Sequence, residues 1–268
     1  MREVYSREVF PNRDQNAYSG TSSTLPILNL AYYPQERGPY NFNTQLDAAG
    51  HLTQPMQTWG GMMRKLDTND FEAANIEYIE FWMLDPFIYT REDGTASQYG
   101  GDLYFNLGDI SEDVLRDGKK FYESGIPVDG SDAFTYSQWG KIPTMNSVTY
   151  AFATSGGSRE KQDVGLNGLN DQEERSFYQQ YLSEVRANVT GEALDSINAD
   201  PAGDDYRYFR GSALDEKEAP ILERYKYINN PQGNSPESTG NFNPSYKSTP
   251  DVEDINQDYT LNEYEKYY

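Results

Sequence analysis

The sequence has no cysteine and a single histidine, His51. Without cysteine the chain cannot form disulfides, thiolate nucleophiles or zinc sites of the cysteine type. Any Ser/His/Asp centre would have to use His51, which lies between Gly50 and Leu52 in a turn-rich region, where a solvated loop histidine is the more ordinary role. Carboxylate pairs for glycoside hydrolysis are possible among 43 acidic residues, but no spacing singles one out. We therefore expect a protein that is not an enzyme.

Positive charge is also scarce, with 22 Lys and Arg against 43 Asp and Glu and a formal net charge of -21. Nucleic acids and anionic lipid surfaces are bound through clustered basic residues, so nucleic acid is excluded as an expected partner. An excess of carboxylates suits calcium, although a plain acidic surface explains it as well. No apolar run has membrane-spanning length and no export leader follows Met1, so an exported chain of this kind would be an internal piece of a larger protein.

Aromatic residues are abundant, with 23 Tyr, 12 Phe and 3 Trp, and they supply enough large side chains for a folded core. We expect one core, built from three parts. Residues 1–66 form a turn-rich segment that packs on the core, residues 67–228 form the core itself, and residues 229–268 form a loop and an acidic C-terminal segment.

Two stretches have the pattern of β-strands. Residues 76–83 and 102–107 both alternate large apolar side chains, and a polar, glycine-bearing loop separates them. Further extended runs are expected at 139–142 and 147–152. Together they predict a mainly β fold, a jelly-roll-like sandwich similar to carbohydrate-binding modules, with one or two short helices and long loops.

Two helices are expected beside the sheet. Ser111 and the carboxylates after it favour a short helix over 114–122, which Gly118 would interrupt. The clearer helix runs over 171–186, where Asp171 and Glu174 have the spacing of a capping box.

Seven blocks of sequence, in a fixed order, carry a resemblance to a known family. They are YYP (32–34), RGPYN (37–41), WGGMMR (59–64), DFEAANIEYIEFW (70–82), GGDLYFNLGDISED (100–113), QDVGLNGL (162–169) and EDINQD (253–258). In this order they resemble the SprA (Sov) family, the outer-membrane translocon of type IX secretion that also supports gliding motility.

The resemblance implies a very large outer-membrane β-barrel protein that passes folded cargo to the cell surface. This chain would be one soluble domain of such a protein, at the outer membrane or cell surface. Its expected work is structural or partner-docking, and the expected partners are other parts of the translocon barrel and secreted or accessory proteins. The main alternative is a surface carbohydrate-binding module, in which exposed aromatic side chains would stack on sugars, although such side chains more often pack in cores. The candidates are Tyr32, Tyr33, Tyr40, Trp59, Tyr99 and Trp139.

Residues 163–174 fit much of a twelve-residue calcium loop. Gly168 falls at position 6, where a sharp turn is needed, whereas Gly165 at position 3 offers no side-chain oxygen. The capping box uses the same Asp171 and Glu174 without an ion, so both interpretations stay open. The ligands would be Asp163, Asn167, Leu169 (through its carbonyl), Asp171 and Glu174.

Residues 254–265 are a second candidate calcium loop. Tyr259 occupies position 6, where glycine is normally required, so an acidic solvated turn is the competing interpretation. The expected ligands are Asp254, Asn256, Asp258, Thr260 and Glu265.

Overall fold

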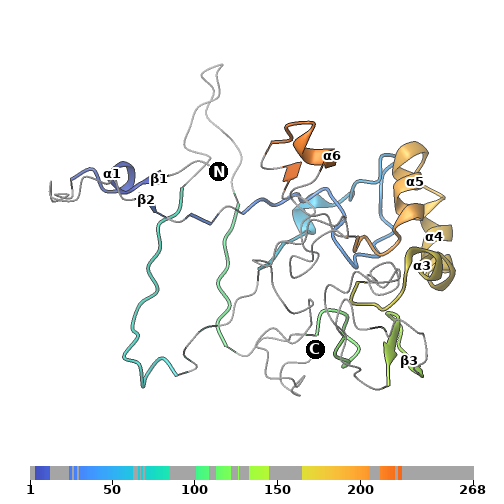
Figure 1. The fold of residues 1–268 in the computed structure, drawn as a ribbon, viewed down its shortest axis with the longest axis horizontal. Helices are drawn as coiled ribbons and strands as arrows, with labels where there is room; N and C mark the ends of the chain where they lie inside the picture. The colour runs from blue at the N-terminus through green and yellow to red at the C-terminus, as the bar shows by residue number, and fades with distance from the viewer. Residues whose placement is uncertain are drawn as a thin grey trace.

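The computed structural model describes residues 4–12, 24–25, 27–28, 30–62, 66, 68, 70–84, 101–108, 113–121, 126, 133–144, 165–205, 212–220 and 223–224. A cluster of helices forms one side of the molecule, and long extended stretches lie on the other side (Figure 1). In chain order the elements are β1 (Val4–Tyr5), α1 (Ser6–Val9), β2 (Thr24–Leu25), the 3-10 helix η1 (Pro55–Gln57), β3 (Phe134–Tyr136), β4 (Lys141–Pro143), α3 (Asp171–Phe177), α4 (Gln179–Val185), α5 (Gly191–Ala199) and α6 (Ser212–Asp215).

Helices α3, α4 and α5 pack against one another and hold the main core. The helix expected over 171–186 is present as α3 and α4, which Tyr178 separates with a non-helical backbone (φ -96, ψ 29). Four members of its predicted apolar stripe, Tyr178, Tyr181, Leu182 and Val185, are buried, as the 3.6-residue period requires. The fifth, Phe177, is 37% exposed. Helix α5 begins at Gly191, and its sequence pattern did not predict it.

The core joins these helices to the segment 46–52, which precedes them by more than a hundred residues. Thr190 donates its backbone N–H to the carbonyl of Ala48, and Leu46 and Leu52 form an isolated antiparallel bridge beneath the helices. Burial of these apolar side chains is the main force that holds the two regions together. The buried cluster consists of Tyr40, Leu46, Leu52, Leu115, Leu166, Leu169, Tyr178, Tyr181, Leu182, Val185, Val189, Ile197 and Ala202.

The predicted mainly β sandwich is wrong. Strands account for 8% of the described residues and helices for 24%. The strands form two small antiparallel pairs, β1 with β2 and β3 with β4, and in the second pair Thr135 lies opposite Ile142. The extended run expected at 139–142 thus corresponds in part to β4.

The two stretches that predicted the central strands, 76–83 and 102–107, are extended but belong to no sheet among the described residues. An alternating apolar pattern reports only that a segment suits a sheet, and a strand also needs a neighbour to pair with. The described part of this chain supplies no such neighbour. The two stretches are therefore extended, as their pattern predicts, but they do not form a sheet.

The short helix expected over 114–122 is also wrong, since residues 114–118 form turns and bends. The Asp113 carboxylate accepts the backbone N–H groups of Asp117 and Gly118, at 3.3 and 2.7 Å. Arg116 (φ 57) and Gly118 (φ 68) are in the left-handed region, which interrupts a right-handed helix. The local carboxylate therefore captures N–H groups that a helix would have used.

The strand expected at 147–152 and the segment 229–268 lie outside the described residues. The division of the chain at residues 66 and 228 stays a prediction. No helix of the described part combines the length and the apolar character that crossing a membrane requires.

Candidate metal centre

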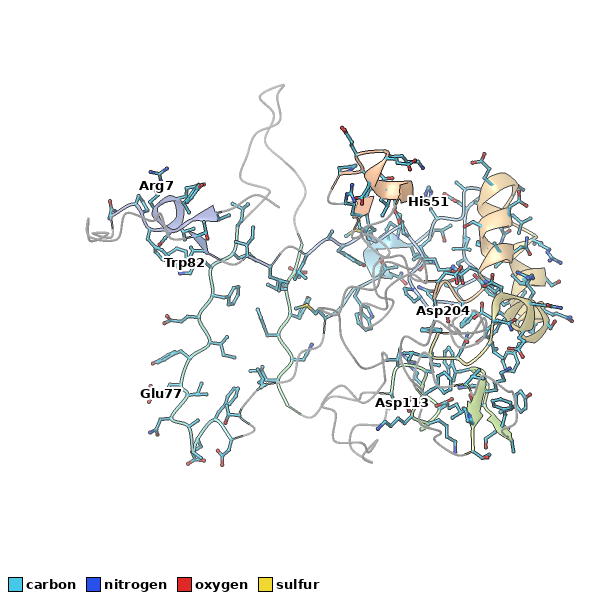
Figure 2. The ribbon with its side chains drawn as sticks, viewed as in Figure 1. Arg7, His51, Glu77, Trp82, Asp113 and Asp204 are labelled. Carbon is cyan, nitrogen blue, oxygen red and sulfur yellow. The ribbon has the colours of Figure 1, made fainter. Side chains whose placement is uncertain are left out.

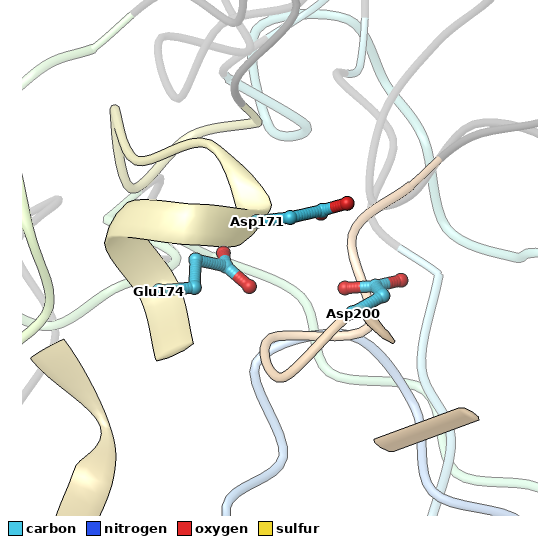
Figure 3. Close-up of side chains that lie close together, drawn as sticks. All are labelled: Asp171, Glu174 and Asp200. Carbon is cyan, nitrogen blue, oxygen red and sulfur yellow. The ribbon is translucent and has the colours of Figure 1, made fainter. Parts of the chain in front are cut away.

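Three carboxyl groups converge where α3 begins and α5 ends. Asp171 is the first residue of α3, Glu174 lies one turn later, and Asp200 follows α5. One carboxylate oxygen from each lies within 4.8 Å of the other two, and the three side chains point toward one another (Figure 3).

The start of α3 determines which of its acidic residues face inward. Asn170 is the N-cap: its side chain accepts the N–H of Glu173, and the Glu173 side chain accepts the N–H of Asn170, at 3.0 and 3.2 Å. The predicted capping box of Asp171 and Glu174 is therefore displaced by one residue. Because successive helix residues are rotated by about 100°, this displacement turns Glu174 away from solvent.

Glu174 is 1% exposed and carries two hydrogen bonds. Oε1 accepts Nδ2 of Asn167, and Oε2 accepts the backbone N–H of Ala202 at 2.9 Å. Burial raises its pKa to about 7, with further contributions from the charges of Asp200 and Asp171, while the two hydrogen bonds act in the opposite direction. Glu174 is the carboxyl group in the trio that is least favourable to ionise.

Asp200 organises the turn after α5. Oδ1 accepts the N–H groups of Gly203 and Asp204, at 2.7 and 3.2 Å, and Oδ2 accepts that of Asp205 at 3.3 Å. This arrangement fixes the carboxylate on the side of the turn that faces α3. Asp171 faces it from the helix, and burial and the charge of Asp200 raise the pKa of Asp171.

A fourth carboxyl group, Asp204, lies on the same turn (Figure 2). It is 8% exposed, and its Oδ2 has no hydrogen-bond partner among the described residues. Burial raises its pKa well above the ordinary value, and the charges of Glu174 and Asp200 add to the effect. Buried carboxylate oxygens are normally paired, so this atom is an exception that calls for an explanation.

The structure describes only part of the first predicted calcium loop. Asn167, Leu169, Asp171 and Glu174 are described, whereas Asp163 lies outside the described residues. The Asn167 side chain holds the loop together, because Oδ1 accepts the N–H of Leu169 at 2.8 Å while Nδ2 bonds Glu174. The second loop, with Asp254, Asn256, Asp258, Thr260 and Glu265, lies wholly outside the described residues, and both loops stay predictions.

Asp200 and Asp204 were missed because Asp200 belongs to an Asp-Pro step that indicates only a turn, and Asp204 follows within the same turn. The acidic residues of that turn were the available signal. Sequence spacing cannot say that a turn after one helix returns to the first residue of another, so the link between 171 and 200 required the fold.

His51 is not part of this cluster. Its side chain is half exposed, and Nδ1 lies 3.5 Å from Oδ2 of Asp47. Two N–H groups, of Ala49 and His51, donate to the Asp47 carboxylate, which lowers its pKa. His51 therefore belongs to a tight turn.

The aromatic side chains singled out as sugar-stacking candidates divide into two groups. Tyr40 is buried and its hydroxyl accepts the N–H of Leu166, and Trp139 packs against the main core. Tyr32 and Trp59 are exposed instead. Core packing thus explains the first group but not the second, and Tyr99 lies outside the described residues.

Chemically, the cluster offers only oxygen donors. An oxygen-only set of converging carboxylates suits a hard cation such as Ca²⁺ or Mg²⁺ and does not suit metals that favour imidazole or thiolate. Without a cation, the same groups must share protons or repel one another.

Comparison with known proteins gives one match. Residues 180–268 match the family model SprA_N, described as "Motility related/secretion protein". The match includes Asp200, Asp204 and the block EDINQD, whereas the other six blocks of the resemblance precede it. No curated protein and no solved structure matches the chain.

Proposed function

We propose that this chain is a non-catalytic docking domain of an outer-membrane protein-secretion translocon, in the cell envelope. The match of residues 180–268 to the SprA_N family, described as a motility related/secretion protein, supports the proposal. Its partner is another part of that translocon, which contributes β-strands. The observation that supports docking is the exposure of two extended apolar segments, residues 76–84 and 101–108.

Neither face of the first segment is buried. The odd-numbered side chains Ile79, Phe81 and Met83 are 52, 53 and 64% exposed, and the even-numbered Tyr78, Trp82 and Leu84 are 77, 76 and 76% exposed. Since alternate side chains of an extended chain point to opposite faces, both faces are apolar and open. Such a segment leaves an unusually large apolar surface in water for a folded chain.

The second segment has the same character. Leu103, Phe105 and Leu107 are 55 to 58% exposed on one face and Tyr104 is 77% exposed on the other. The two segments touch through Phe81 and Phe105, whose ring centroids are 5.0 Å apart. Both segments run outside the helical cluster (Figure 1).

Backbone chemistry indicates how a partner would bind. Among the described residues, the backbone groups of 77–84 and 101–108 make no hydrogen bond. An extended chain with free N–H and C=O groups and apolar side chains on both faces is suited to add to a sheet edge and be covered on both sides. A sheet from the surrounding translocon fits these requirements.

The proposed role has no catalytic step. The only histidine serves a tight turn, and the converging carboxyl groups are embedded in structural hydrogen bonds to Asn167 and Ala202. The carbohydrate-binding alternative was based on a β-sandwich, and without that sandwich no described feature favours it over docking.

Photo-crosslinking in the full-length protein in its native envelope tests the proposal. A photoreactive phenylalanine analogue is placed at position 82 or 104, with position 56 as the matched control because Met56 is 95% exposed but lies in η1. We expect crosslinks from 82 and 104 to peptides of the translocon, identified by mass spectrometry. Crosslinking no stronger than at position 56 would contradict the docking role.

A secretion assay accompanies the crosslinking. Tyr78→Lys together with Trp82→Lys is expected to reduce secretion at an unchanged level of the protein, because a charge cannot be covered by an apolar partner. Met56→Lys is expected to leave secretion intact. Equal secretion by both variants would count against the segment as a docking surface.

A further inference from the structure

We propose that an aromatic cleft on helices α3 and α4 receives the side chain of an arginine from a partner polypeptide. The cleft has a volume of about 360 Å³, near the lower end of the range for ligand pockets, so it admits one side chain. It shares no residue with segments 76–84 and 101–108, and the inference therefore goes beyond the proposed docking role. Its principal lining residues are Phe42, Trp139, Phe177, Tyr178, Tyr181 and Glu184.

Aromatic rings form most of the cleft. Tyr178 and Tyr181 are buried and form its deeper part, whereas Phe177 is 37% exposed. Both tyrosine hydroxyls are already hydrogen-bonded, since that of Tyr178 donates to the carbonyl of Trp139 and that of Tyr181 accepts Nη1 of Arg37 at 3.0 Å. The two tyrosines therefore offer their rings to a ligand and not their hydroxyl groups.

The rings face in several directions and do not form a flat platform. The Phe42 ring is inclined by 88° to that of Tyr181 and by 46° to that of Trp139, with centroids 5.2 and 6.0 Å apart. Phe177 meets Tyr178 at 79°. A cation is attracted by the negative face of each ring that surrounds it, whereas a sugar ring stacks on a level aromatic surface. The geometry thus favours a compact cation over a sugar.

The charge of the cleft also suits a cation. Glu184 is the one charged residue in its lining, and it makes no salt bridge in the described part of the chain. Gln180 donates Nε2 to Oε1 of Glu184 at 3.1 Å, which holds the carboxylate beside the rings. Arg37 already lies 5.7 Å from the centroid of the Tyr181 ring, so a second cation depends on the other rings and on Glu184. The net charge of -21 attracts basic segments over a longer range.

The polar part of the lining favours arginine over lysine. A guanidinium group is planar, is less strongly hydrated than an ammonium group, and stacks on aromatic faces while its five N–H donors stay free for acceptors. The carboxylate of Glu184 accepts such a fork through two oxygens, and Gln138 supplies an amide in the same lining. A lysine would place one compact, strongly hydrated charge there and would lose more hydration on entry.

The test uses the whole 268-residue chain. The probe is N-acetyl-arginine amide, and its matched control is N-acetyl-citrulline amide, which has nearly the same shape but no charge. Binding is followed through the NMR signal of the Trp139 indole N–H, which Trp139→Phe identifies. We expect a saturable shift with a Kd of roughly 5 mM, because one side chain covers little surface. The citrulline compound should bind about fivefold more weakly.

Two variants assign the site. Glu184→Gln should weaken binding of the arginine compound about threefold and leave that of the citrulline compound unchanged. Glu192→Gln is its control, because Glu192 is exposed on α5 and does not line the cleft. Phe177→Ala should weaken the arginine compound about threefold, with the exposed Met56→Ala as control. Far-UV circular dichroism of each variant separates loss of binding from loss of folding.

Four results would overturn the proposal. The first is the absence of a saturable shift of the Trp139 signal up to roughly 50 mM of the arginine compound. The second is equal affinity for the citrulline compound, which would show that charge plays no part. The third is undiminished affinity in a folded Glu184→Gln or Phe177→Ala variant. The fourth is tighter binding of the disaccharide cellobiose than of the arginine compound, which would assign the cleft to a sugar.

Discussion

Arg37 donates a hydrogen bond from Nη1 to the hydroxyl of Tyr181, at 3.0 Å, across 144 residues of sequence. The same nitrogen donates to the carbonyls of Pro201 and Asn41, and Nη2 donates to that of Asp200. One guanidinium group therefore joins an early turn, helix α4 and the turn that carries Asp200. No other described side chain links these three regions through hydrogen bonds.

Replacement of Arg37 tests how much this junction stabilises the fold. Arg37→Ala leaves several carbonyls and a buried hydroxyl without their donor, so we expect a loss of about 3 kcal/mol in the free energy of unfolding. Arg37→Lys should be intermediate, because an ammonium group keeps the charge but not the planar fork. Urea unfolding measures both. Arg186→Ala, which removes an exposed contact to Asn198, serves as control and should cost less than about 0.5 kcal/mol.

Gly168 and Gly191 offer a matched pair of left-handed glycines. An added Cβ at Gly168 (φ +69) would lie 2.1 Å from the carbonyl oxygen of Lys141, whereas one at Gly191 (φ +63) would meet nothing within 4 Å. Gly191→Ala should therefore cost only the backbone strain, about 1 kcal/mol. Gly168→Ala should cost roughly 3 kcal/mol or more, since the close contact between Lys141 of β4 and the loop that carries Gly168 must open. Equal losses in thermal or urea unfolding would show that the close approach at 168 is not maintained in solution.

The part of the fold that was predictable from sequence is the part encoded locally. The helical region of α3 and α4 followed from the apolar stripe and an acidic start. The break at Tyr178 was not predicted, and the cap was misplaced, since Asn170 rather than Asp171 provides it. Residues 76–83 are extended and apolar, but the predicted strand is wrong, since they are exposed and belong to no sheet among the described residues. The error lay in supplying them with a partner inside this chain, because strand pairing is non-local and a pattern carries no information about the neighbour.

The same distinction applies to the carboxylate cluster. Sequence spacing placed Asp171 and Glu174, which lie one helical turn apart, in one predicted calcium loop, and the structure brings their carboxylates together. It could not identify Asp200, since the return of that turn to α3 depends on the packing of α5 and on Arg37. A continuous twelve-residue loop was the natural local hypothesis, and the fold presents a discontinuous alternative.

The exposed segments predict how the isolated chain behaves in solution. With both faces of 76–84 and 101–108 open, the chain should bind a hydrophobic dye such as ANS while fully folded. Trp82→Ser with Tyr104→Ser should lower the dye fluorescence severalfold and shift the urea midpoint by little, because exposed side chains contribute little to stability. Dye fluorescence and unfolding are measured on the same samples. A large loss of stability would mean that the segments pack against this chain in solution.

The raised pKa of Glu174 predicts a pH dependence of stability in the absence of metal. Burial moves it from 4.5 to about 7, so the folded state holds a proton that the unfolded state releases. The resulting stabilisation is complete below about pH 4.5 and is lost as the pH rises to about 7, a change of roughly 3 kcal/mol. Asp204, whose pKa is also raised, acts in the same direction.

Glu174→Gln isolates this contribution, because an amide stays neutral at every pH. Unfolding free energies are measured in chelator from pH 4.5 to 8 for both proteins, so that the titration of the other carboxylates cancels in the difference. We expect the wild-type chain to lose about 3 kcal/mol relative to the variant over that range. A difference that stays constant with pH would show that Glu174 titrates normally and is not held in the buried position next to Asn167.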